Sequence, residues 1–181
     1  MPSRGRVMRK FLIVVDMQND FIGGVLGSDE AKAIVPNVIH RILDAKAENR
    51  SILFTQDTHD EGYLQTSEGR HLPVPHCVKG TDGWKLHPDI APYAEEVIQK
   101  PTFASLALVD RLGGEAAGQD LDIALCGVCT DICVVSNALL LRAFFPEATL
   151  GVYADACAGV TKESHNAALA VLRTCHVAFL R

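Results

Sequence analysis

The sequence lacks long hydrophobic runs, an excess of basic charge and internal repeats. The longest apolar runs, such as Phe11–Val15, are far too short to span a bilayer. The 181 residues carry 17 basic and 22 acidic side chains, a formal net charge of −5. This balance disfavours a general nucleic-acid binder, because phosphate binding needs a basic surface. We therefore expect neither a nucleic-acid partner nor a membrane association.

The sequence also lacks a recognisable secretory leader. The basic start Met1–Met8 is not followed by the apolar segment and cleavage site that a leader needs. Six cysteines in such a chain indicate reduced thiols rather than a disulfide framework. We therefore expect a cytoplasmic protein.

Short apolar segments alternate with longer segments of helical periodicity. Near-continuous apolarity is typical of strands in a sheet that is covered on both faces. The predicted strands are Lys10–Val15, Ser51–Thr55, Glu96–Ile98, Leu121–Leu125, Ala148–Tyr153 and His176–Leu180, and the apolar stripes predict helices over Ala31–Asn49, Ile132–Phe145 and Glu163–Arg173. The alternation predicts an α/β protein, with three layers (α/β/α) around a mainly parallel, roughly six-stranded, Rossmann-like sheet.

No linker or low-complexity stretch divides the chain, and its length suits one hydrophobic core. We expect a single domain over residues 10–181, preceded by an N-terminal tail of residues 1–9. The segment Asp57–Pro92 interrupts the alternation and is rich in glycine, histidine and proline. A stretch this long without regular structure usually has a functional role.

Reactive side chains follow the predicted strands. In open parallel sheets, ligands bind in the crevice beyond the carboxyl ends of the strands. The first four predicted strands are followed by Asp16, Asp57, Lys100 and the segment Cys126–Cys133. Packing of the core alone would not put polar groups there so regularly, so this pattern predicts a site at that edge.

The segment Cys126–Cys133 leads into a predicted helix, for which Thr130 and Asp131 are good N-caps. Cys133 would then lie in the first turn, where free N–H groups and the helix dipole lower a thiol pKa and can receive an oxyanion. Other interpretations stay open. Buried cysteines are common small hydrophobes, the segment begins with a thioredoxin-like C-x-x-C spacing, and its three cysteines could hold a cluster.

A second group of donors is compatible with a metal. Asp57 and His59 lie two residues apart on one extended face, and Glu68, His71 and His76 follow in the irregular segment. Two histidines with two carboxylates suit Zn, Mn or Fe. A chain with seven histidines also contains chance pairs, so a purely structural role stays open.

Together these motifs resemble the isochorismatase-like cysteine hydrolases, and within them the nicotinamidase branch. The matching segments occur in family order and are Val15–Phe21, Thr55–His59, Pro75–Thr81, Leu86–Asp89, Lys100 and Gly127–Val134. The resemblance implies the isochorismatase-like hydrolase fold. It also implies a metal-containing cysteine amidohydrolase that converts nicotinamide and water to nicotinate and ammonia, in a pathway of NAD salvage.

The resemblance implies a catalytic triad of Asp16, Lys100 and Cys133. In such a triad the aspartate takes the thiol proton, and the thiolate attacks the carboxamide carbon to form a thioester. A cis peptide bond is expected between Val128 and Cys129. By the same analogy, the N–H groups of Cys129 and Cys133 form the oxyanion hole.

The resemblance further implies a metal that binds the pyridine nitrogen of the substrate. Its ligands would be Asp57, His59 and His76, with Glu68 as the fourth. His71 is the competing candidate, but His76 lies in the Pro-His-Cys-Val-x-Gly-Thr context that the family uses. Zinc is the expected metal, with manganese or iron as alternatives.

Phe21 matches the aromatic residue that stacks on the substrate ring in this family. The chain departs from the pattern at Leu72–Pro75, where an aromatic residue usually precedes the ligand histidine. Phe103, in the segment after Lys100, is expected to supply the missing contact. Members of the family often form dimers or tetramers, so a homo-oligomer is expected.

Three other functions stay open. A sister amidase would act on an N-carbamoyl compound or a ureide, but such relatives often lack the metal ligands that Asp57 and the two histidines would supply. Isochorismatase itself does not use the cysteine, so Cys133 argues against it. A non-catalytic or thiol-redox protein on the same fold would show a reversible disulfide between Cys126 and Cys129.

Overall fold

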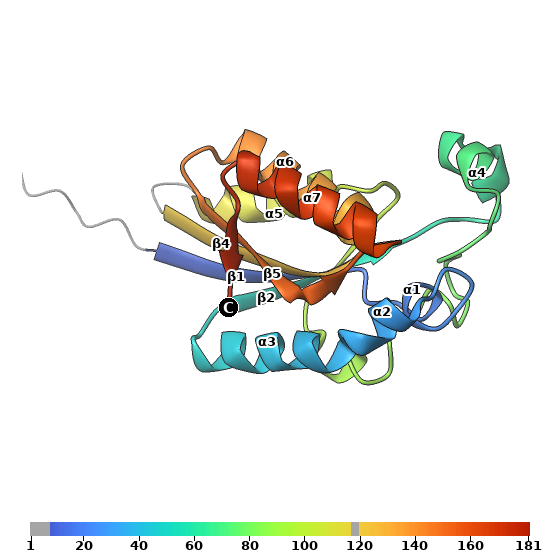
Figure 1. Cartoon of the computed structure of the whole chain (residues 1–181), viewed down its shortest axis with the longest axis horizontal. Helices are drawn as coiled ribbons and strands as arrows, with labels where there is room; N and C mark the ends of the chain where they lie inside the picture. The colour runs from blue at the N-terminus through green and yellow to red at the C-terminus, as the bar shows by residue number, and fades with distance from the viewer. Residues whose placement is uncertain (1–7, 117–119) are drawn as a thin grey trace, which may run out of the picture.

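The computed structural model describes residues 8–116 and 120–181, and its strands form one sheet (Figure 1). The strands are β1 (Met8–Val15), β2 (Ser51–Asp57), β3 (Val97–Lys100), β4 (Asp120–Val128), β5 (Thr149–Ala158) and β6 (Ala178–Leu180). Their order is β3-β2-β1-β4-β5-β6, and all neighbours are parallel. The predicted six-stranded parallel sheet is confirmed, with the strand order of a Rossmann-like fold.

The first strand begins two residues earlier than predicted. Strand β1 begins at Met8, so two residues of the predicted tail belong to the sheet. Residues 1–7 of that tail lie outside the described residues.

Helices cover both faces of the sheet (Figure 1). Helix α3 (Val35–Ala47) lies on one face, and helices α5 (Leu106–Ala116), α6 (Val135–Phe144) and α7 (Lys162–Thr174) lie on the other. The short helices α1 (Asn19–Ile22), α2 (Asp29–Ala33) and α4 (Ser67–His71) gather near the carboxyl ends of the strands. Two 3-10 turns, η1 (Tyr63–Gln65) and η2 (Ala91–Tyr93), and a π-helical turn, η3 (Thr130–Val134), complete the chain. Within the described ranges, every helix is too short or too polar to cross a membrane.

The centre of the sheet explains the continuous apolar runs. All five residues of Phe11–Val15 are fully buried, because β1 pairs with β2 on one side and with β4 on the other and helices cover both faces. Burial of this kind fixes where β1 ends, and therefore fixes the residue that follows it.

Two helix predictions differ from the structure. The helix expected over Ala31–Asn49 is divided into α2 and α3, with Pro36 in the first turn of α3. Proline lacks an N–H group and fits only a first turn, which is why the helix divides there. Helix α5 was not predicted, because the pair Gly113–Gly114 weakens its helical pattern.

Gly127 is required where β4 approaches β1. Its φ is +116°, and a Cβ atom there would overlap the carbonyl oxygen of Val15. We expect Gly127→Ala to lower the free energy of unfolding by about 1–3 kcal/mol, measured by urea denaturation. The matched control is Gly113→Ala, at an exposed helical position with open space around it, which should raise stability by about 0.5–1 kcal/mol. Equal stability of Gly127→Ala and the wild type would contradict this account.

Candidate active site

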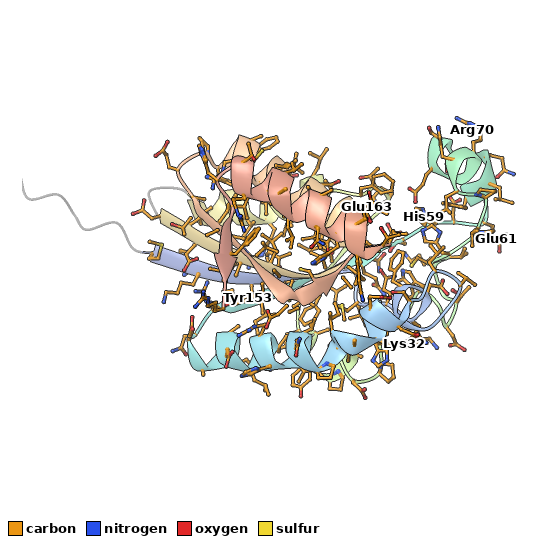
Figure 2. All side chains as sticks on the ribbon, viewed as in Figure 1. Lys32, His59, Glu61, Arg70, Tyr153 and Glu163 are labelled. Carbon is orange, nitrogen blue, oxygen red and sulfur yellow. The ribbon has the colours of Figure 1, made fainter. Side chains whose placement is uncertain are left out.

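Four reactive side chains meet at the carboxyl ends of β1 to β4. Asp16 directly follows β1, Asp57 is the last residue of β2, Lys100 is the last residue of β3, and Cys133 lies in η3 just after β4. Figure 2 shows His59 at this same end of the sheet, near the helix that carries Arg70. The predicted positions of these residues at strand ends are therefore confirmed.

Lys100 holds this group together. Its Nζ lies 2.7 Å from Asp16 Oδ2, 3.3 Å from Asp57 Oδ1 and 3.5 Å from Cys133 Sγ. The second oxygen of Asp16 accepts a hydrogen bond from Thr55 Oγ1 at 2.7 Å. All of these side chains are buried. Asp16 also has a φ of +50°, a left-handed conformation that few non-glycine residues adopt.

Burial and neighbouring charges set the protonation of the group. The pKa of Asp16 is raised above its ordinary value, chiefly by burial, although Lys100 acts to lower it. Burial also raises the pKa of the Cys133 thiol well above its usual range, and the Asp16 carboxylate adds to this effect. Burial lowers the pKa of the Lys100 ammonium group, but the negative charges around it raise that pKa overall. The prediction that a helix terminus lowers the pKa of Cys133 is therefore wrong, and the thiol needs a base to become a nucleophile.

The turn that carries Cys133 differs from the expected helix start. The peptide bond between Val128 and Cys129 is cis, as the resemblance implies. The N–H of Val134 donates to the carbonyl of Cys129 at 3.0 Å, which widens the first turn into a π-helical one. This geometry places Cys133 at the pocket described below.

Thr130 and Asp131 do not cap this turn, so that prediction is wrong. The turn has no side-chain cap, and its N-cap residue is Cys129. The Thr130 hydroxyl lies 2.8 Å from His165 Nδ1, and the Asp131 carboxylate accepts a hydrogen bond from the N–H of Val160 at 3.1 Å. Both side chains face α7 and the loop before it rather than the free N–H groups of their own helix.

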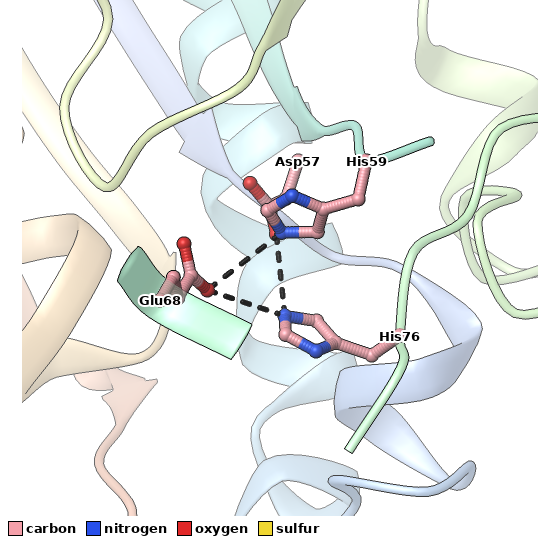
Figure 3. Close-up of side chains that lie close together, drawn as sticks. All are labelled: Asp57, His59, Glu68 and His76. Atoms are coloured by element: carbon pink, nitrogen blue, oxygen red, sulfur yellow. Dashed lines mark ion pairs between the residues drawn. The ribbon is translucent and has the colours of Figure 1, made fainter. Parts of the chain in front are cut away.

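Four candidate metal ligands form a cluster beside Lys100 (Figure 3). One donor atom from each of Asp57, His59, Glu68 and His76 lies within 4.8 Å of the other three. The Nε2 atoms of His59 and His76 lie 2.9 and 3.5 Å from Asp57 Oδ2. They lie 3.7 and 3.6 Å from Glu68 Oε1. The structure therefore brings all four predicted ligands together.

The cluster fits a divalent metal by its donor chemistry. His59 Nε2 is buried and makes no aligned hydrogen bond, although Asp57 Oδ2 lies 2.9 Å away, so its lone pair is available to a metal. His76 Nδ1 contacts the carbonyl of Val74 at 2.9 Å, which leaves its Nε2 directed toward the cluster. Two imidazoles with two carboxylates are donors that zinc prefers. His71 is exposed and contacts the carbonyl of Ser67, outside this cluster.

Asp57 belongs to both groups. Burial favours its protonated form, but the interactions with His59 and His76 and the charge of Lys100 keep its pKa below the ordinary value. Asp57 is therefore ionised near neutral pH, which suits a metal ligand.

A pocket of about 340 Å³ opens onto both groups. Its reactive side is formed by Cys133, Asp57, Glu68 and His76. Its remaining wall is largely apolar, and it contains Phe21, Leu26, Ala31, Leu72, Cys129, Ile132, Ala158 and Val160. A pocket of this size and lining is suited to a small ligand with an apolar ring.

The two predicted aromatic contacts have different outcomes. Phe21 lines the pocket, and its ring centroid lies 5.5 Å from that of His76. Phe103 is 45% exposed and is not among the residues that line the pocket, so the structure does not bring it to the site. Where the family usually has an aromatic residue before the ligand histidine, this chain has the aliphatic Leu72 in the wall of the pocket.

Several residues that support the site were not singled out from the sequence. Gln18 donates to the carbonyl of Asp57 at 2.8 Å and accepts from its N–H at 2.7 Å. Tyr63 packs against the rings of His59 and His76, with centroid distances of 4.7 and 5.0 Å. Gln18 lies inside a matched motif, which is a signal that could have identified it. Tyr63 lies in the irregular segment, where no periodicity marks it.

The comparisons with known proteins identify relatives of this chain. A nicotinamidase from Schizosaccharomyces pombe is 29% identical, and the match covers 87% of this chain and 86% of that protein. The nicotinamidase/pyrazinamidase of Mycobacterium tuberculosis is also 29% identical, and the match covers 92% of this chain and 95% of that protein. The crystal structure of the Pyrococcus horikoshii pyrazinamidase in complex with zinc superposes with a TM-score of 0.78 at 27% identity, covering 96% of this chain and 99% of that one. The isochorismatase domain model matches residues 10–180. Since that match spans nearly all of the sequence, the chain belongs to the isochorismatase family.

Proposed function

We propose that this protein hydrolyses nicotinamide to nicotinate and ammonia, through a thioester on Cys133. The observation that carries the proposal is the meeting of Asp16, Lys100 and Cys133 beside a cluster of four metal-type donors at one pocket. The nicotinamidases among the relatives support the choice of substrate.

In the first half of the reaction, Asp16 takes the proton from the Cys133 thiol, and the sulfur attacks the carboxamide carbon. The raised pKa of Asp16 suits this role, because a stronger base accepts a thiol proton more readily. Lys100 contacts both groups and keeps carboxylate and sulfur in register. The N–H groups of Cys129 and Cys133 are proposed to hold the oxyanion.

In the second half, the carbon–nitrogen bond breaks, and Asp16 returns its proton to the departing ammonia. A water molecule then attacks the thioester carbon, with Asp16 accepting a proton from it. The bond between carbon and sulfur breaks, nicotinate forms, and the Cys133 thiol is regenerated. Phe21 is proposed to pack against the pyridine ring during both steps.

We propose that the cluster of Asp57, His59, Glu68 and His76 holds zinc, with manganese or iron as alternatives. When bound, such an ion supplies a Lewis acid that can bind the ring nitrogen and polarise nearby groups. The zinc complex of the Pyrococcus horikoshii relative supports the choice of metal. The six free cysteines support a reducing, cytoplasmic location. A role in NAD salvage is proposed from the substrate, nicotinamide. The expected homo-oligomer stays a prediction.

The first test is ammonia release from nicotinamide by the purified protein. We expect turnover that falls after chelation and returns when zinc or manganese is added, because the cluster orients the substrate ring. A panel of small amides, including N-carbamoyl compounds and ureides, is measured in parallel. Release from one of those amides instead of nicotinamide, in folded and metal-loaded protein, would contradict the proposed substrate.

Cys133→Ala should reduce amide hydrolysis by more than about 10³-fold, because it removes the nucleophile. Its metal content, measured by elemental analysis, should equal that of the wild type. Cys175→Ala is the matched control, since Cys175 lies at the end of α7, outside the pocket lining. Retained turnover in Cys133→Ala would exclude the thioester mechanism.

His59→Ala should weaken metal binding by at least about 10-fold, because it removes one of four donors from a buried cluster. Metal content after dialysis against a competing chelator measures this loss directly. His71→Ala changes an exposed histidine outside the cluster and should bind metal as the wild type does. Equal metal content in the two variants would show that His59 is not a ligand.

A further inference from the structure

Asn137 is a fully buried polar residue on α6, one turn after the nucleophile. Its side-chain N–H₂ group donates to the carbonyl of Cys133 at 2.8 Å and to the carbonyl of Phe103 at 3.1 Å. Its side-chain oxygen accepts a hydrogen bond from the N–H of Ser105 at 2.9 Å. Three partners from two separate segments therefore converge on one amide group.

The segment that Asn137 binds is the loop that follows the catalytic lysine. Lys100 Nζ itself donates to the carbonyl of Thr102 at 3.1 Å, so this loop contacts the ammonium directly. At the far end of the loop, Ser105 directly precedes α5, and its hydroxyl accepts a hydrogen bond from the N–H of Leu108 in the first turn of that helix. The loop is thus fixed at Lys100 on one side, at α5 on the other, and at Asn137 in between.

Only an amide can make this set of bonds at one buried position. Two carbonyls need donors and one N–H needs an acceptor, and asparagine supplies both from a single planar group. Leaving any of these backbone groups without a partner inside the protein is costly. Helix α6 alone would need only apolar side chains on its buried face. The hydrogen-bonding needs of the loop therefore explain why an asparagine is buried there.

We propose that Asn137 is a positioning residue that holds the Lys100 loop against the turn of Cys133. Its three hydrogen bonds join the segment that carries Lys100 to the segment that carries Cys133. The Nζ of that lysine lies 3.5 Å from the sulfur of that cysteine. Asn137 touches neither the pocket nor the reacting atoms, so it acts through their relative placement. The inference rests on the proposed hydrolytic function for its activity readout.

Two variants separate the loop bonds from the helix bond. Asn137→Leu has a similar size and removes all three bonds. Asn137→Thr removes both loop bonds, but a threonine hydroxyl can still donate to the carbonyl four residues earlier, which is that of Cys133. Leu141→Ala is the matched control, because it removes a fully buried side chain from the same helix and leaves the three Asn137 hydrogen-bonding groups in place.

We expect both Asn137 variants to lower kcat by roughly 10- to 100-fold, because misplacing reacting groups by about 1 Å can cost that much. Their KM and metal content should stay within about 2-fold of the wild type, since the pocket wall and the metal ligands are unchanged. Leu141→Ala, assayed well below its melting temperature, should keep the kcat of the wild type. A wild-type kcat in Asn137→Thr, or equal losses in Asn137→Leu and Leu141→Ala, would overturn the proposal.

Alkylation of Cys133 by iodoacetamide keeps this test independent of the substrate. Lys100 stabilises the thiolate, so the rate at fixed pH should fall in both Asn137 variants and stay unchanged in Leu141→Ala. If the wild type hydrolyses no amide, the proposed function fails, while the alkylation rates still decide the role of Asn137. Equal rates in the wild type and Asn137→Leu would refute that role.

Discussion

The site depends on one buried ammonium group. The Lys100 side chain is fully buried, and an unpaired charge there would cost several kcal/mol. Two carboxylates compensate for it, Asp16 at 2.7 Å and Asp57 at 3.3 Å. The lysine in turn allows both carboxylates to be buried close together. This mutual dependence fixes the ends of β1, β2 and β3 relative to one another.

The strand order explains how residues far apart in the sequence reach this ammonium. β3, β2, β1 and β4 are neighbours in the sheet, so the residues that follow them are aligned along its carboxyl edge. The order reverses between β1 and β4, which in open parallel sheets is where the crevice for a ligand forms. Asp16 follows β1 and the turn of Cys133 follows β4, which are the two strands at that reversal. The apolar core of β1 is therefore what places the carboxylate opposite the sulfur.

Much of this arrangement could be predicted from the sequence, because it depends on where strands end. An apolar run such as Phe11–Val15 stops at a polar residue, and parallel topology then determines which polar residues meet. The π-helical turn could not be predicted, since Thr130 and Asp131 suit a helix cap equally well until α7 and the loop before it offer them other partners. The raised pKa of the Cys133 thiol could not be predicted either, because it also depends on tertiary contacts. A helix terminus is visible in the sequence, whereas burial and the nearby carboxylate arise only from tertiary structure.

Side chains that act between segments were the hardest to foresee. Asn137 lies four residues after Cys133, a spacing that indicates a contact within one helical turn. Its other two partners lie in a loop whose path no sequence pattern predicts. Tyr63 packs against two histidines from different parts of an irregular segment. Phe103 shows the converse, because this aromatic residue is close to Lys100 in the sequence but is exposed and does not line the pocket.

Asp57 connects the two halves of the site through its two oxygens. Oδ1 faces Lys100 at 3.3 Å, while Oδ2 faces the histidine nitrogens of the cluster. With neutral histidines, the three carboxylates of Asp16, Asp57 and Glu68 outnumber the one ammonium and leave a formal charge of −2 when all are ionised. Burial accordingly raises the pKa of Glu68 and of Asp16, with Asp57 adding to both effects. A divalent cation held by the cluster would balance that charge, so its binding and the protonation of Asp16 would be linked through a single carboxylate.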